Sequence, residues 1–186
     1  MRWIQPPVIL LGKPPRQGLI SYRRLTWNDF TIRNISSGAS AQTGAVLYAT
    51  YKWGWTSVGR RFTGELTQVS IGAWFDPQAS WRKPDVKSDN VFLLEHEQRH
   101  FDLCEVGARK LRDQLLVLNW SPVGTSESQI REQIEGRLTP LINDFIQDVK
   151  DQQENYDRES NHSQNQRSQQ LWNRRVQAEL NRLAPL

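Results

Sequence analysis

Two of the three histidines in this chain lie four residues apart, in the pentapeptide His96-Glu97-Gln98-Arg99-His100. Apolar residues recur at helical spacing around it, and Ser88 or Asp89 can cap its start, so the sequence predicts a helix over residues 88–118. A helix turns by about 100° per residue, which places the two imidazoles within about 40° of each other on one face. Both rings can therefore bind one metal ion.

The glutamate that follows the first histidine is placed as a general base. Glu97 lies about 100° round the helix from His96, too far to join the same coordination sphere but close enough to contact a water on the metal. Catalytic zinc typically keeps three protein ligands and a water, whose pKa falls from about 15.7 to about 7. Glu97 would take the proton of that water and deliver it to the leaving amine, a role worth about 10² to 10⁴ in rate. The pentapeptide therefore predicts a zinc site with its own base; the alternative is a chance pattern on a solvated helix.

A third zinc ligand must come from elsewhere in the fold. The first candidate is His162, the remaining histidine, because the polar segment that carries it follows an amphipathic helix that could return it to the site. Asp157 and Glu154 are the alternatives, since a carboxylate also serves as the third ligand in zinc hydrolases. Tyr156 could donate a hydrogen bond to the oxyanion, and Asp157 could instead orient a ligating imidazole.

Three residues that follow the pentapeptide are excluded as third ligands. Asp102 and Glu105 lie at about 240° and about 180° round a helix whose metal face is near about 0° to 40°. Cys104 lies one turn beyond His100, too far along the axis to close a tetrahedron, and is predicted to belong to the core. As the only cysteine of the chain, it also excludes an intramolecular disulfide.

The composition is that of a folded protein with a polar surface. The 186 residues suit one domain, and eight tryptophans and six phenylalanines supply apolar surface for a core. The net charge is +4, and the basic residues are interleaved with acids, so they predict a solvated surface and no nucleic-acid partner. No apolar run reaches the roughly 18 residues of a transmembrane helix, and the prolines near Met1–Gly12 make it a poor signal peptide.

The first half of the chain is predicted to form a small sheet. Residues 1–24 are rich in proline and are predicted to be an irregular lead-in to a single domain over 25–186. Alternating apolar residues predict two strands, 45–53 and 65–75, with a connection near Gly59. The sheet, within 25–80, therefore precedes the metal helix, and the chain is predicted to be an α+β protein.

The second half is predicted to be helical over residues 126–183. Helical spacing runs over 126–154 straight across Pro140, which predicts one kinked helix or two abutting helices. Residues 152–170 are rich in Asn, Gln and Ser, and by composition alone they predict a linker. A last helix is predicted through residues 171–183.

Several segments between residues 25 and 178 resemble one family. They are Leu25-Thr26-Trp27-Asn28-Asp29-Phe30, Phe75-Asp76-Pro77 with Ser80-Trp81, Leu94 to Asp102, Tyr156-Asp157, Asn161-His162, and Gln169 with Trp172. Together they resemble the bacterial zinc-dependent proteases catalogued as domain of unknown function 922. The resemblance implies a zincin-like fold, in which a small antiparallel or mixed sheet packs on the helix that carries the pentapeptide. It also implies that His96 and His100 are ligands, that Glu97 is the base, and that His162 matches a histidine of the family's tail. Members often carry a signal peptide, which implies secretion or a periplasmic location.

These observations lead to two hypotheses for the function. The first is a metallopeptidase that uses one Zn²⁺ ion to cleave a peptide or protein substrate, with the strand over 65–75 accepting the extended substrate by edge pairing. The second is a protein-binding module in which the metal site is structural or vestigial. The two hypotheses differ at Glu97, because hydrolysis needs a base there and a structural site does not.

Overall fold

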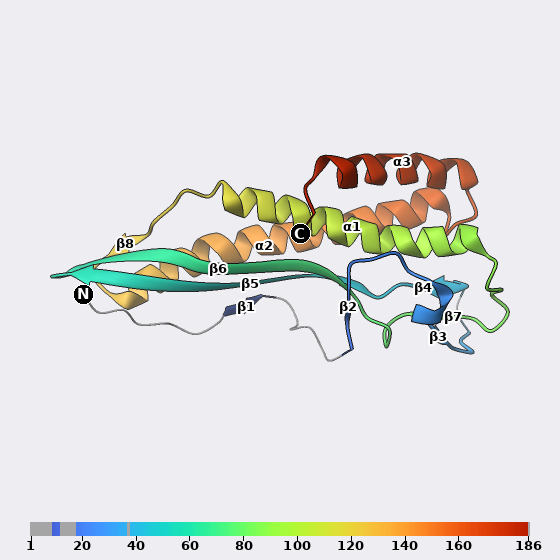
Figure 1. Ribbon diagram of the computed structural model, residues 1–186, viewed down its shortest axis with the longest axis horizontal. Helices are drawn as coiled ribbons and strands as arrows, with labels where there is room; N and C mark the ends of the chain where they lie inside the picture. The colour runs from blue at the N-terminus through green and yellow to red at the C-terminus, as the bar shows by residue number, and fades with distance from the viewer. Residues whose placement is uncertain (1–8, 12–17, 37, 186) are drawn as a thin grey trace.

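The computed structural model describes residues 9–11, 18–36 and 38–185. Two helices pack on a long β-hairpin, a third helix packs on those two, and a small second sheet lies beside one end of the hairpin (Figure 1), so the predicted α+β class is confirmed. The helices are α1 (Val91–Leu116), α2 (Glu127–Ser160) and α3 (Gln166–Arg182), and a 3-10 helix spans Trp27–Asp29. The strands are β1 (Ile9–Leu11), β2 (Ile20–Ser21), β3 (Thr31–Ile32), β4 (Ala41–Gln42), β5 (Ala45–Val58), β6 (Arg61–Phe75), β7 (Trp81–Arg82) and β8 (Val123–Gly124).

The hairpin of β5 and β6 is the largest element of the main sheet. The two strands pair antiparallel from Ala45 opposite Phe75 to Val58 opposite Arg61. Gly59 has φ +58°, which a two-residue hairpin turn requires and which glycine adopts without steric cost. Both strands continue past the predicted bounds as far as this turn, because Trp55 and Phe62 still pack against each other with ring centroids 4.9 Å apart.

Two short strands of the lead-in add to the main sheet. β1 pairs with β5 and β2 pairs with β6, so the described part of residues 1–24 is not irregular throughout, and the rest of the predicted lead-in lies outside the described residues. The strand order is β1-β5-β6-β2, and β8 pairs with the turn end of β6. β6 therefore has β5 on one side and both β2 and β8 on the other.

The second sheet carries one wall of the candidate site. Its order is β3-β7-β4, with β3 parallel and β4 antiparallel to the central strand β7. β4 is therefore an edge strand. It lies against α1 and leads, after only two residues, into the hairpin strand β5.

Helix α1 is covered on several sides at once. The hairpin and α2 pack on one side of it, and α3 packs on another, as the layers of Figure 1 show. The larger core joins the hairpin, α1 and α2, and its largest fully buried members are Tyr51, Trp53, Phe75, Phe101, Leu111, Ile130, Ile134, Leu138 and Ile142. A second core joins α1 and α2 to α3 through Leu103, Val106, Tyr156, Trp172, Val176, Leu180 and Leu183. The polar residues of the pentapeptide are consequently buried.

Helix α2 is longer than the sequence predicts. It runs without a break across Pro140 and ends only at Ser160, and α3 begins at Gln166, so the linker predicted over 152–170 is wrong. The segment stays helical because Tyr156 and Ser160 are buried in α2, as are Gln169 and Trp172 in α3. Asn161, in the left-handed conformation at φ 48°, ends α2, and the Asn165 side chain caps α3 by accepting from Ser168 N.

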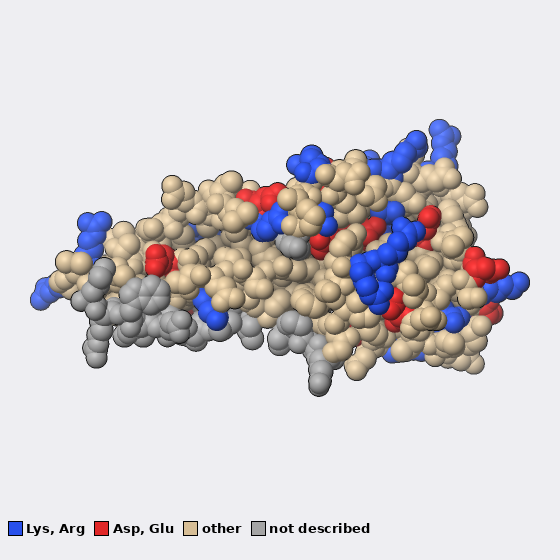
Figure 2. All heavy atoms as spheres, in the orientation of Figure 1, with Lys and Arg blue, Asp and Glu red and all other residues tan. Residues whose placement is uncertain are grey.

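The surface is polar and mixed in charge. On the face drawn in Figure 2, Lys and Arg side chains are dispersed along the molecule, and Asp and Glu lie among them. None of the helices in the described ranges is long and apolar enough to cross a lipid bilayer.

Candidate metal centre

Three side chains that could hold a metal ion converge between α1 and α2. His96 and His100 lie one turn apart on α1 and are buried, and their ring centroids are 5.0 Å apart. Asp157, near the end of α2, places its Oδ1 atom 3.1 Å from His96 Nε2 and 3.0 Å from His100 Nε2. One donor atom from each of the three residues lies within 4.8 Å of the others. The convergence of the two histidines is as the helical spacing predicts.

These three donors could hold a metal ion. For zinc, ligand bonds of about 2.0 to 2.2 Å at tetrahedral angles put neighbouring donor atoms about 3.3 to 3.6 Å apart. The two contacts of Asp157 are slightly shorter than that separation. Two imidazoles with one carboxylate also form a donor set that catalytic zinc uses, with a fourth position left for water.

Mutual electrostatics favour a charged Asp157. Burial raises its pKa, but hydrogen bonds and charge from His100 and His96 outweigh burial and hold the pKa of the carboxyl well below its usual range. Burial lowers the pKa of His100, whereas the hydrogen bond and charge of Asp157 and the charge of Glu97 raise it, with a net rise. The carboxylate is therefore ionised at neutral pH, as metal binding requires.

Glu97 lies beside the three donors without being one of them. Its side chain is buried, and Thr43 Oγ1 donates a hydrogen bond to Glu97 Oε2 over 2.7 Å. Burial raises the pKa of Glu97, and the charges of His100 and His96 oppose that rise. A raised pKa lies closer to neutral pH, and the carboxylate is then a stronger proton acceptor. This property suits a general base.

A cavity of about 750 Å³ opens on this group. Residues 38–43, which include β4, form one wall, and the first turns of α1 form another. The end of α2 and residues 162–164 complete the lining. His96, Glu97, His100 and Asp157 all contribute to the lining, so a substrate in the cavity would reach each of them.

His162 lies at the mouth of this cavity and not in the converging group. Its side chain is 64% exposed, and its Nδ1 atom is 3.6 Å from Asp157 Oδ1. The turn that carries it is unusual, since Asn161, His162 and Ser163 all have positive φ. Glu154 also lines the cavity without joining the three donors. Of the three candidates for the third ligand, Asp157 is the one that converges with both histidines, and a ligand role for His162 stays a prediction.

Tyr156 packs behind the imidazoles. Its ring stacks on His96 with centroids 4.7 Å apart and meets the His100 ring edge-on at 5.3 Å, and Trp172 of α3 supports its far side. The Tyr156 hydroxyl is buried, has no hydrogen-bond partner among the described residues, and is absent from the lining of the cavity. His96 Nδ1 likewise has no partner within the described ranges, so this ring is oriented by its packing on Tyr156 and by the contact of its Nε2 atom with Asp157. The oxyanion role of Tyr156 stays a prediction, and the geometry gives it a packing role.

The other two residues of the pentapeptide anchor α1 to its surroundings. Gln98 Oε1 accepts a hydrogen bond from Leu25 N, and Gln98 Nε2 donates to Asp102 Oδ1. Arg99 donates to Asp102 Oδ2 and, on α3, to Asn173 Oδ1. Both side chains therefore face away from the cavity and fix the helix that carries the histidines.

Sequence reasoning missed Thr43 and the wall formed by residues 38–43. The residues of this wall are small or polar and fall in no motif, and β4 has only two residues, which gives no periodicity to detect. One sequence feature could have indicated this wall: residues 38–43 lie immediately before the strand that begins at Ala45.

Cys104 is a core residue, and its thiol should be unreactive in the native protein. The residue is fully buried, Gln153 Nε2 donates to its Sγ atom over 3.3 Å, and burial raises the pKa of the thiol to about 12. We expect iodoacetamide at pH 8 to leave native Cys104 unlabelled and to label it completely in guanidinium chloride, as read by intact mass. Native labelling at the rate of a free thiol would contradict this placement.

No family model, no curated protein and no solved structure matches this chain. The resemblance to domain of unknown function 922, and the zincin-like fold that it implies, stay predictions.

Proposed function

We propose that this chain is a zinc-dependent hydrolase that cleaves peptide bonds, with His96, His100 and Asp157 as metal ligands and Glu97 as general base. The observation that carries the proposal is the convergence of three donor atoms within 4.8 Å at the wall of a cavity. Structural zinc sites are typically closed by four protein ligands, whereas catalytic sites keep three and an open position. Three donors beside open space support the catalytic alternative over the structural one.

Each residue has a defined task in this proposal. When bound, zinc lowers the pKa of a coordinated water and polarises the carbonyl of the scissile bond. Glu97, which lines the same cavity, takes the proton of the attacking water and delivers it to the leaving amine. Tyr156 holds the His96 ring from behind.

The wall at β4 is the place for an extended substrate. The sequence points to the strand over 65–75, but β6 does not line the cavity, and β2 and β8 occupy the ends of its edge opposite β5. β4 is an edge strand and does line it. Ser40 O accepts from Lys83 N, so by alternation the backbone groups of Ala41 and Thr43 face away from β7. A peptide strand that pairs there would cross the cavity beside Glu97.

The ligand set predicts different zinc affinities for two variants. We expect the purified wild-type chain to bind one zinc ion, and Asp157→Asn to weaken binding more than about 100-fold, because a metal ligand contributes more than the outer partners whose loss costs about 10- to 100-fold. His162→Ala is the matched comparison, since its imidazole contacts the same carboxylate from outside the converging group, and it should bind zinc much more tightly than Asp157→Asn. Competition with a chromogenic chelator measures all three affinities.

If His162→Ala weakened zinc binding more than Asp157→Asn did, His162 would replace Asp157 as the third ligand, and the class of activity would stay open.

The activity itself is tested by metal removal. Cleavage of a mixed peptide pool, followed by mass spectrometry, should stop after dialysis against a chelator and return with added zinc. Zinc-loaded wild-type protein that leaves the pool intact would overturn the proposed function.

A further inference from the structure

Thr43 lies at the corner between β4 and β5, and its hydroxyl contacts the proposed base. Thr43 Oγ1 is 2.7 Å from Glu97 Oε2 and 3.2 Å from the Glu97 carbonyl oxygen. A hydroxyl has a single proton to donate, and the shorter contact is to the carboxylate. A hydrogen bond to an ionised group is about twice as strong as a neutral one, so the carboxylate is the preferred acceptor.

The corner that carries Thr43 is held by a network of buried contacts. Gly44 N donates to Ser80 Oγ over 2.9 Å, and Gly44 O accepts from Asp76 N over 2.7 Å. Ser80 is fully buried, and its hydroxyl donates to Asp76 O over 2.7 Å. A Cβ atom at Gly44 would lie 2.6 Å from Ala79 Cβ. The chain at Gly44 therefore approaches the chain at Ala79 more closely than a residue with a side chain at position 44 would allow. The backbone next to Thr43 is therefore fixed.

This network includes residues from two segments that resemble domain of unknown function 922 but have no role in the proposed metal site. Asp76 belongs to the segment Phe75-Asp76-Pro77, and Ser80-Trp81 follows it. Trp81 Nε1 donates to Gln42 Oε1 over 3.1 Å, which ties the same turn to β4 as well. The turn over residues 76–81 thus supports both strands that flank Thr43.

We infer that Thr43 is a positioning residue for Glu97, held in place by the turn over residues 76–81; this rests on the proposed function. The Glu97 side chain has rotatable bonds, and the Thr43 hydroxyl fixes its carboxylate at the cavity wall. A displacement of about 1 Å in a catalytic group can cost about 10²-fold in rate. Thr43 is not among the three converging donors, and its hydroxyl contacts Glu97, so the hydroxyl acts through the base.

Three variants separate positioning from general damage. Thr43→Val keeps the shape and removes the hydroxyl, Thr43→Ser restores the hydroxyl, and Thr67→Val makes the same change at an exposed site on β6. We expect Thr43→Val to lower kcat for peptide cleavage about 10- to 100-fold with KM and zinc affinity unchanged. Thr43→Ser should recover most of kcat, and Thr67→Val should match the wild type.

A second readout needs neither zinc nor turnover. The ¹³C resonance of the Glu97 side-chain carboxyl, assigned by its loss in Glu97→Gln, should move in metal-free Thr43→Val and stay in place in Thr43→Ser and Thr67→Val. An unmoved resonance, or a kcat for Thr43→Val equal to that of Thr67→Val, would overturn the inference. If the wild type cleaves nothing, the proposed function fails, and the carboxyl resonance alone still decides whether Thr43 holds Glu97.

Discussion

Replacing Glu97 with glutamine should leave the zinc site loaded and lower kcat for peptide cleavage about 10²- to 10⁴-fold. Glutamine has the same shape, and Thr43 can still donate to its amide oxygen, but the amide cannot take a proton from water. Zinc should stay bound because Glu97 is not among the three converging donors. Metal analysis and kcat from the same preparation test both halves of this expectation.

The same variant should be at least as stable as the wild type. Burial raises the pKa of Glu97, which means that the folded state disfavours its ionised form and that a neutral side chain relieves the cost. A loss of activity in Glu97→Gln therefore cannot be assigned to unfolding if its urea midpoint is unchanged or higher. Undiminished cleavage with bound zinc would remove Glu97 from the mechanism.

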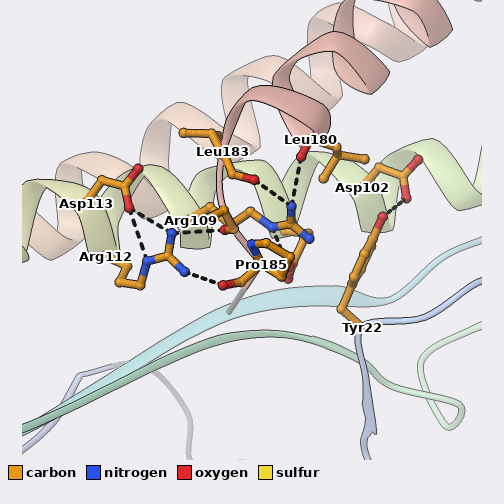
Figure 3. Close-up of polar contacts among 10 residues, drawn as sticks. Tyr22, Asp102, Arg109, Arg112, Asp113, Leu180, Leu183 and Pro185 are labelled. Carbon is orange, nitrogen blue, oxygen red and sulfur yellow. Dashed lines mark hydrogen bonds and ion pairs between the residues drawn. The ribbon is translucent and has the colours of Figure 1, made fainter.

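Replacing Arg109 with methionine should destabilise the fold by about 3–5 kcal/mol, because it leaves a buried charge without its partner. Arg109 lies on α1 and donates to Glu105 Oε1 over 2.8 Å. It also donates to two carbonyl oxygens at the end of α3, Leu180 O at 2.9 Å and Leu183 O at 3.0 Å (Figure 3). The variant leaves a buried carboxylate and both carbonyls unpaired, and urea unfolding followed by circular dichroism measures the cost.

Arg112 provides the control for this prediction. It lies three residues along the same helix, and it also donates to carbonyl oxygens after α3, those of Ala184 and Pro185. Its side chain is 21% exposed and its partner Asp113 is 46% exposed, so Arg112→Met should cost less than about 1 kcal/mol. The double variant Glu105→Leu with Arg109→Met should recover most of the loss, since it removes both charges of this buried pair.

The cost of Arg109→Met should also depend on pH. Burial raises the pKa of Glu105, and the hydrogen bond and charge of Arg109 oppose that rise, so removing Arg109 lets the folded-state pKa rise further. A carboxyl whose pKa is raised on folding destabilises the fold at high pH and ceases to do so as pH falls to its unfolded value of about 4.3. The deficit of the variant should therefore shrink between pH 7 and pH 4. Equal deficits at both pH values would contradict the assignment to Glu105.

The helices and strands with regularly spaced apolar residues could be predicted from the sequence, because that spacing follows from the burial of one face of the element. The helix with the pentapeptide, the two long strands and the pairing of His96 with His100 all follow from such spacing. Composition failed at residues 152–170, which are polar but helical apart from the turn over 161–165, because a few buried residues such as Tyr156 decide the fold of that segment. A polar helix of this kind depends on tertiary contacts rather than on its own pattern.

The remaining parts of the site depend on contacts between distant segments. The sequence favours His162 over Asp157 as the third ligand, and only the packing of α2 on α1 shows that Asp157 is the one that reaches both imidazoles. Thr43 meets Glu97 because a two-residue strand ends beside α1, and a strand that short leaves no pattern. Spacing along one helix was predictable, whereas juxtaposition across elements was not.

The donors of the metal centre are drawn from two helices, and His100 and Asp157 are separated by 57 positions along the chain. A cation held between them would act as a removable cross-link, since it would close a long loop that the unfolded chain leaves open. Its free energy of binding would add to the free energy of unfolding in proportion to the logarithm of the cation concentration. The melting temperature of the chain would then report zinc occupancy directly, without any substrate.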